Sequence, residues 1–208
     1  MNTHQTATYK DACQEVREHI FDRKIPHDQE LTLERMATLT GMESGQMQHV
    51  LDRLVQEHIL LQAAPQVYRV RQFKDCEAVE LYDARIALQT LGAKMFATRA
   101  AQARIDDLRS LLIPFGKGPT NPKVYNKIDY HFHGIIMRNT GNPFLRDIFN
   151  GGNILSYTAL IGLQRPPQEL FDEHINIVSA MHKREPELAA TLMKKHLERS
   201  KLVLLNKF

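Results

Sequence analysis

The sequence has little cysteine, no long apolar run and little net charge, and each shortage excludes a class of protein. Cys13 and Cys76 are the only two cysteines among 208 residues, too few for a disulfide framework, so we expect both thiols to be reduced. No stretch of about 18 uncharged apolar residues exists, and the first residues lack the apolar segment of a secretory signal. We therefore expect a soluble, cytoplasmic protein that does not contact membranes.

Charge is nearly balanced over the whole chain but unevenly distributed along it. The formal net charge is +3, yet residues 1–72 hold eight Lys or Arg against ten Asp or Glu. A surface that binds nucleic acid normally needs Lys and Arg to release counterions from phosphates. The slightly acidic first third of the chain therefore argues against strong DNA binding by that part.

Hydrophobic residues make up 43% of the chain and follow a helical period through most of it. In the first third, Gly41 supplies a turn between two short helical segments, and two β-favouring runs follow. The expected elements are helices near residues 8–23, 32–39 and 43–55, then strands at 59–62 and 67–71. Three helices and a hairpin, in this order, are typical of a winged helix-turn-helix, which we assign to residues 1–72.

Strand signals end near Lys74, and residues 73–208 are predicted to form an all-helical domain built as an antiparallel bundle. Proline and glycine residues divide this region, most densely at 114–122. The best-marked helices are expected near residues 75–100, 122–139, 143–164, 167–183 and 186–205. The whole chain is therefore predicted to be mainly α-helical.

Asp129 and His133 stand four residues apart in a helical segment, so both side chains project from one face and can share an ion. His174 and His196 lie on two later helices among apolar residues that turn part of each helix inward. Three imidazoles and one carboxylate suit Zn or Ni, with Fe or Mn as alternatives. The spacing of Asp129 and His133 is equally compatible with a contact between the two side chains on the surface. Spacing alone therefore does not distinguish a metal site from a surface contact.

Two groups of residues carry a resemblance to a known family. Asp129, Phe132 and His133, followed by Gly141-Asn142-Pro143 and an apolar pair, resemble one motif of the FCD domain, the C-terminal effector domain of FadR-like GntR transcription regulators. Further matching residues are Leu81, Tyr82, Arg85, Leu88, Glu173, His174, Ile177, Ala180, Glu187, Ala190, His196 and Leu197. The similarity covers most of residues 74–205.

The resemblance implies a divalent metal ion on Asp129, His133, His174 and His196, with a small carboxylate as effector. Arg85 matches an arginine that faces this site and can pair with a carboxylate. A surface ion pair with Glu80 or Asp83 is the other interpretation of Arg85. Asn142 is a second candidate effector contact, although an Asn at a helix break is commonly a cap. The resemblance also implies a homodimer.

The winged helix departs from the family where DNA contacts are expected. Ser44 and Gln48 stand at the positions of two arginines that normally meet DNA, Glu34 replaces a third, and the wing lacks its usual glycine. We therefore expect weakened operator binding. The remaining candidate DNA contacts are Ser44, Gln46, Gln48, His49, Arg53, Arg69 and Arg71. A polar, solvated face is the alternative for all of them.

The leading hypothesis is a metal-dependent, carboxylate-responsive transcription regulator, a repressor, that binds operator DNA as a dimer. The alternative is a metal- and carboxylate-binding sensor with weakened or lost DNA binding that acts through a protein partner. Three histidines and an aspartate also occur in metalloenzymes. Because no nucleophile motif, phosphate loop or convincing general base is present, we do not expect an enzyme.

Overall fold

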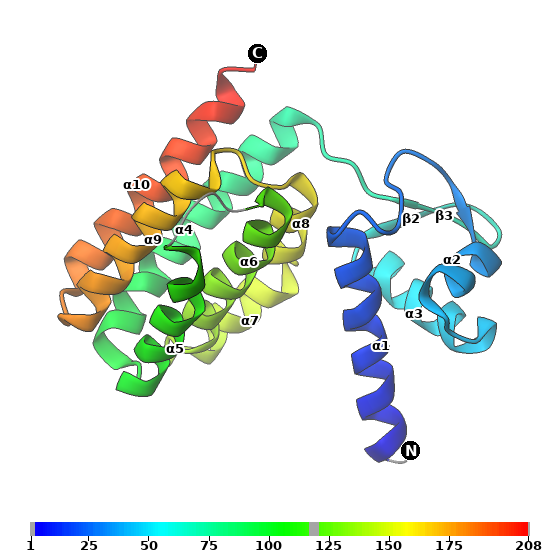
Figure 1. The fold of residues 1–208 in the computed structure, drawn as a ribbon, viewed down its shortest axis with the longest axis horizontal. Helices are drawn as coiled ribbons and strands as arrows, with labels where there is room; N and C mark the ends of the chain where they lie inside the picture. The colour runs from blue at the N-terminus through cyan, green and yellow to red at the C-terminus, as the bar shows by residue number, and fades with distance from the viewer. Residues whose placement is uncertain (1–2, 117–120, 208) are drawn as a thin grey trace. The chain divides into compact units, whose positions relative to one another are not determined.

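Residues 3–116 and 121–207 are described by the structure, a computed structural model (Figure 1). Residues 117–120 of the predicted break at 114–122 lie outside the described residues. The chain divides into two units, Met1–Gln72 and Phe73–Phe208. Among the described residues, no helix combines the length and apolarity needed to cross a membrane.

The first unit is a winged helix. Its elements are α1 Thr3–Phe21, β1 Leu31–Thr32, α2 Leu33–Thr40, α3 Ser44–Gln56, β2 Leu60–Ala64 and β3 Val67–Val70. Helix α2 begins where Thr32 Oγ1 accepts a hydrogen bond from the backbone N–H of Arg35 at 3.1 Å. It ends at Gly41, whose φ of 70° is the left-handed conformation that glycine tolerates best.

The three strands of this unit form one antiparallel sheet in the order β1-β3-β2. Strand β1, which pairs Leu31 with Tyr68, was not predicted, because two residues are too few to show an alternating pattern. The hairpin of β2 and β3 was predicted and is present. Buried side chains of α1, α2 and α3, among them Ile20, Met36 and Leu51, form the core beneath it.

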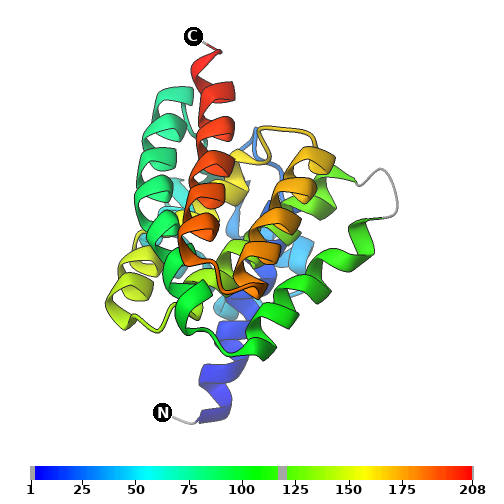
Figure 2. The ribbon, with the colours of Figure 1, turned by 90° about the vertical axis from the view of Figure 1, so that its left-hand side faces the viewer.

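The second unit is all-helical in its described residues. Its elements are α4 Asp75–Arg99, α5 Gln102–Leu112, the 3₁₀ turn η1 Ile113–Phe115, α6 Pro122–Arg138, α7 Pro143–Gly151, α8 Ile154–Ile161, α9 Pro167–His182 and α10 Pro186–Leu205. Figure 2 shows α10 between α4 and α9, in agreement with its contacts to both. The prediction of a winged helix followed by a helical bundle is confirmed.

Two details of the predicted bundle differ from the structure. Helix α5 was not predicted as a separate element because Ala100 and Ala101 separate it from α4 through extended backbone angles alone, without Gly or Pro. The prediction of a single helix at 143–164 was wrong, because this segment forms two helices, α7 and α8. The segment is broken at Gly152 and Asn153, and Asn153 has a φ of 49°, which no α-helix accommodates.

Close packing of α4 on α6 sets the position of the site described below. Gly92 permits this approach, because a Cβ atom there would lie 2.3 Å from Sδ of Met137 on α6. Buried apolar side chains from α4, α6, α9 and α10 fill the remaining interior, including Phe96, Phe132, Ile177 and Met193. The inward faces of α6, α9 and α10 therefore meet around a common core.

Candidate metal centre

Four side chains with potential metal-binding atoms meet inside the helical unit. Asp129 and His133 stand one turn apart on the inward face of α6, whereas His174 comes from α9 and His196 from α10. All four are buried, and one donor atom of each lies within 4.8 Å of the other three. The structure thus brings together the four residues of the predicted metal set.

The separations between donor atoms suit one ion. Nε2 of His133 and Nε2 of His174 each lie 3.5 Å from Oδ1 of Asp129, and the Nε2 atoms of His174 and His196 are 3.3 Å apart. Two ligands bound at about 2.1 Å to a tetrahedral ion lie roughly 3.4 Å from each other. Neither ring nitrogen of His133 forms a hydrogen bond with any residue that the structure describes. Since an unpaired buried nitrogen is destabilising, these residues fit a divalent ion and can hold one.

Burial sets the protonation state of the cluster. It lowers the pKa of His133 to about 4 and also lowers the pKa of His174 and of His196. Burial would raise the pKa of Asp129, but the neighbouring His133 and His174 rings and Arg85 lower it below its ordinary range. At neutral pH the centre therefore presents three neutral imidazoles and one carboxylate, the forms that bind a metal ion.

Two residues outside the cluster orient its rings. Nδ1 of His196 lies 2.8 Å from Oε2 of Glu173, and Nδ1 of His174 lies 3.0 Å from the hydroxyl oxygen of Tyr125. An ionised carboxylate only accepts hydrogen bonds, so Nδ1 of His196 carries the proton and Nε2 keeps its lone pair. The Tyr125 oxygen can accept from His174 in the same way. Outer partners of this kind hold metal-binding histidines in the correct tautomer.

Arginines hold Glu173 in place. Both terminal nitrogens of Arg165 donate to the carboxylate of Glu173, Nη1 to Oε1 at 2.8 Å and Nη2 to Oε2. Nη2 also donates to the backbone carbonyl of His196 at 3.1 Å. Arg199 also bonds Glu173. Burial would raise the pKa of Glu173, but its hydrogen bonds with Arg165 and His196 lower it to about 2. Arg165 therefore joins α9 to α10 beside one of the candidate ligands.

The two predicted effector contacts lie in different parts of the unit. Arg85 is 2% exposed, and its Nη2 lies 4.0 Å from Oδ2 of Asp129, which excludes the surface ion pair considered above. Asn142 caps α7 by accepting a hydrogen bond from the Leu145 N–H at 3.1 Å, and its Nδ2 lies against Sδ of Met95. Met95 is more than two helical turns from Arg85 along α4, so Asn142, which contacts Met95, lies away from Arg85. Of the two predicted effector contacts, only Arg85 lies beside the metal cluster.

The predicted DNA contacts lie on α3 and on or directly after β3. Ser44, Gln46, His49 and Arg53 are exposed on α3, and Arg69 is exposed on β3, whereas Gln48 and Arg71 are partly buried. Several of these side chains already have protein partners. Nε2 of Gln48 donates to Asp52 and to the Tyr68 hydroxyl, and Nε of Arg53 donates to Glu57. The exposed face of α3 is therefore polar but offers little unpaired positive charge.

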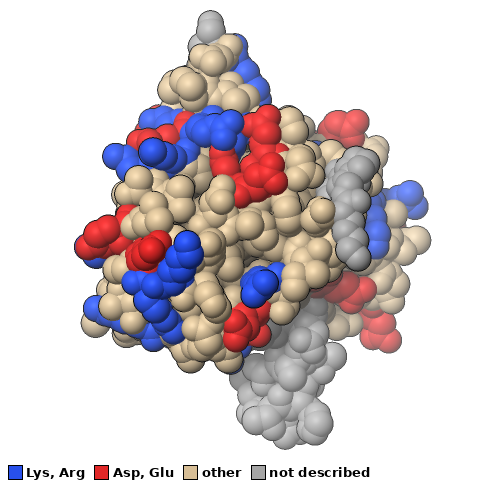
Figure 3. Space-filling view, turned by 60° about the vertical axis from the view of Figure 1, so that its left-hand side comes forward, with Lys and Arg blue, Asp and Glu red and all other residues tan. Residues whose placement is uncertain are grey.

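Other surface features lie away from the four-residue cluster. A groove of about 290 Å³ runs between α5 and α9 and is lined by Arg109, Ile175, Val178, Ser179, His182 and Lys183, none of which belongs to the cluster. The face in Figure 3 carries basic and acidic side chains intermixed around an uncharged area, with no continuous basic surface.

Sequence reasoning did not assign roles to several residues around the site. Glu173 directly precedes His174, and an acidic residue next to a candidate ligand is a usable signal for an outer-shell partner. Tyr125 and Arg165 gave no such signal, because their contacts join different helices. Gln89 stands one turn after Arg85 among inward-facing residues of α4, and a polar residue at such a position is informative.

Comparison with known proteins supports the assignment of the helical unit. The FCD domain family model matches residues 80–199, more than half of the chain. E. coli McbR/YncC has a similar structure, with a TM-score of 0.75 at 13% identity over 96% of this chain and 97% of that one. A candidate transcriptional regulator GntR from Rhodococcus sp. RHA1 gives 0.76 at 14%, over 97% and 99%. At these identities the likeness shows the fold. No curated protein sequence matches the chain.

Proposed function

The chain belongs to the FCD domain family, and from this premise we propose that it is a metal-dependent transcription regulator of the GntR type that responds to a small carboxylate. In this proposal the helical unit binds the ion and the acid, and the winged helix binds operator DNA as part of a homodimer. Effector binding changes the operator affinity, and operator binding represses transcription.

The metal part of the proposal rests on the donor set. Asp129, His133, His174 and His196 would hold the ion, with Zn or Ni preferred and Fe or Mn as alternatives. Bound there, the ion would supply a positive centre to which an acid can bind. Glu173 and Tyr125 would keep the rings of His196 and His174 turned toward it.

The carboxylate part rests on the charges buried at this point. Asp129 contributes one negative charge and Arg85 one positive charge, and the three histidines are neutral. A divalent ion would therefore leave the interior with an excess of positive charge, which is unfavourable in a medium of low polarity. A carboxylate that pairs with Arg85 and reaches the ion offsets that excess.

Dimerisation is supported by an apolar face on α4 and α7. These helices pack together through Leu88, Met95, Leu145 and Phe149, but the neighbouring Leu91, Phe144 and Ile148 are 47%, 80% and 63% exposed. Large exposed apolar groups on adjacent elements are typical of interaction surfaces, and a twofold interface uses the same patch on both subunits. We assign this face to contact with a second copy of the chain.

The observation that carries the proposal is the convergence of one carboxylate and three neutral imidazoles inside an FCD domain. The test begins with elemental analysis and native mass spectrometry of the purified protein, which report the ion, any bound acid and the number of subunits. Selection from random DNA, with and without chelator, then reports the operator. Absence of bound metal, or of any preferred DNA sequence for a folded dimer, contradicts the regulator proposal.

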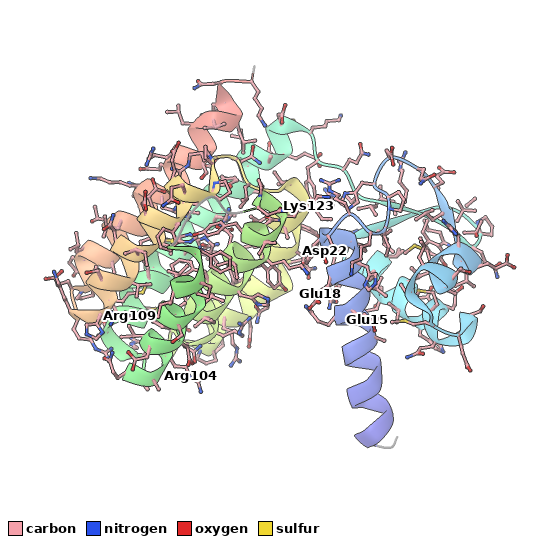
Figure 4. The ribbon with its side chains drawn as sticks, viewed as in Figure 1. Glu15, Glu18, Asp22, Arg104, Arg109 and Lys123 are labelled. Carbon is pink, nitrogen blue, oxygen red and sulfur yellow. The ribbon has the colours of Figure 1, made fainter. Side chains whose placement is uncertain are left out.

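A second candidate function is favoured by the winged helix itself. The α3 face offers little unpaired positive charge, and α1 carries the acidic residues Glu15 and Glu18, with Asp22 directly after its last residue (Figure 4). Such a unit suits a protein partner better than phosphates. In this alternative the metal- and acid-binding sensor acts through that partner. A stable protein complex formed by a metal-loaded dimer that shows no DNA preference distinguishes it from the first proposal.

A further inference from the structure

Gln89 is a buried polar residue on the inward face of α4. Its side chain is 0% exposed, and it lies one helical turn after Arg85, which is also buried. Residues four apart on a helix lie on the same face, about 6 Å apart along the axis. Gln89 therefore extends the line of polar groups that Arg85 begins.

The pairing of α4 with α6 places Gln89 at the level of the metal cluster. Arg85 lies beside Asp129, and farther along the same helices Gly92 lies beside Met137. The two helices thus run in the same direction, and one turn forward from the first pair brings Gln89 level with His133. Gln89 belongs to the wall that faces the candidate ligands.

Several polar atoms of this wall have no hydrogen-bond partner among the described residues. Within the described part of the chain, the amide of Gln89 forms no hydrogen bond, and neither do Nε of Arg85 and the ring nitrogens of His133, although Nε2 of His133 lies 3.5 Å from Oδ1 of Asp129. Buried polar groups in proteins are nearly always paired, because an unpaired one loses its hydration without compensation. A methionine would fill the same space at Gln89 without that penalty. The Gln89 amide therefore offers one donor and one acceptor that a bound molecule can pair with.

We propose that Gln89 is a specificity-determining residue that hydrogen-bonds a hydroxyl group of the effector, so that the acid bound here is a small hydroxy acid. This inference rests on the proposed function, since Arg85 and the ion would bind the carboxylate. A hydroxyl both donates and accepts, which matches an amide whose Nε2 and Oε1 are both unpaired. Because Gln89 lies only one helical turn from Arg85, the hydroxyl of the effector is expected within a few atoms of the effector's carboxylate.

The test uses pairs of acids that differ only by a hydroxyl. Propionate is compared with lactate, butyrate with 3-hydroxybutyrate and succinate with malate, by calorimetry on the metal-loaded protein. We expect wild type to bind at least one hydroxy acid about tenfold or more tightly than its partner. In Gln89→Met that preference falls below about threefold, while the affinity for the plain acid is retained. Gln168→Met, an exposed change of the same type on α9, keeps the wild-type preference.

Unfolding of the ligand-free protein supplies a second readout. Removing an unpaired buried amide raises the unfolding temperature of Gln89→Met, whereas loss of a purely structural hydrogen bond lowers it. A lowered unfolding temperature, or a hydroxyl preference that survives in Gln89→Met, overturns the inference. If the acids bind and Arg85→Met weakens them but Gln89→Met changes nothing, only this inference fails. If no acid binds to the metal-loaded protein, the carboxylate part of the proposed function fails with it.

Discussion

At the scale of single residues, each candidate ligand is an uncharged imidazole or a carboxylate in a buried position, so its removal affects binding and folding together. We predict that His174→Ala and His196→Ala lose the bound ion. A tightly bound ion contributes about 4 kcal/mol when its free concentration is a thousandfold above Kd. We therefore expect the unfolding temperature to fall by roughly 10 °C. Elemental analysis and calorimetric unfolding measure the two effects.

His182→Ala is the matched control, because His182 is exposed on the same helix α9 and lies outside the cluster. It should keep both the metal and the unfolding temperature. Wild-type metal content in both ligand variants would show that these histidines do not hold the ion.

The carboxylate of Glu173 sets the tautomer of His196. A substitution of Glu173 should therefore change the metal affinity although Glu173 is not itself a candidate ligand. We predict that Glu173→Gln lowers metal affinity about tenfold, the lower end of the range for outer-shell partners of metal-binding histidines. Competition with a chelating dye measures the affinity. Glu169→Gln is the control, because Glu169 bonds Arg199 but not His196. An equal loss in both variants would assign the effect to the arginine network instead of to His196.

At the scale of secondary-structure elements, the three helices α6, α9 and α10 meet through imidazoles whose pKa values are lowered by burial. In the unfolded, metal-free chain these histidines take up protons as the pH falls below about 6.5. In the folded chain His133 takes up its proton only near pH 4. Stability should fall as pH falls through this window, by up to about 1.4 kcal/mol per pH unit for each histidine.

Urea unfolding of chelator-treated protein between pH 7.5 and 5 measures this dependence. His133→Gln removes one of the titrating groups, so its stability should change less steeply with pH than that of wild type. A slope that is unchanged in this variant would mean that His133 is not a buried neutral imidazole in the metal-free protein.

Helix α3 has Ser44 and Gln48 at positions where the regulators that the chain resembles have arginines that meet DNA. We predict that the double variant Ser44→Arg with Gln48→Arg binds operator DNA about tenfold or more tightly than wild type. Its plot of log affinity against log salt should be steeper by about two, since each phosphate contact adds about 0.9 to the slope. Fluorescence anisotropy over a salt series measures both quantities.

Gln29→Arg adds a positive charge to an exposed position outside α3 and serves as the control. An equal gain in the control would indicate a general charge effect. No gain in the double variant would favour the protein-partner alternative for the winged helix.

At the scale of the whole molecule, the proposed function requires two copies of the chain. We predict that Phe144→Asp, in the exposed apolar face of α4 and α7, converts the dimer to monomers at micromolar concentration, since it places a charge in the contact. Sedimentation velocity reports the mass. Val124→Asp changes another exposed apolar residue, on α6, and should remain dimeric. Monomers from both variants, or from neither, would exclude this face as the dimer contact.

Much of the fold was predictable because its signals are local. The helical period, the turn at Gly41 and the hairpin runs each depend on neighbouring residues, and the winged helix and the bundle follow from their order. The helix boundaries that were predicted wrongly also depend on a few neighbouring residues. The break at Gly152 and Asn153 was overlooked, and the separation of α4 from α5 uses alanines that carry no turn signal.

From the sequence alone it could be predicted that Asp129 and His133 share a helix face, because that relation follows from their spacing of four residues. The tertiary structure was needed to show that His174 and His196 meet them, that Glu173 orients one ring and that the buried Gln89 amide has no hydrogen-bond partner among the described residues. These relations depend on how each helix is rotated and shifted against its neighbours. Helical periodicity describes one helix at a time and contains no information about that register.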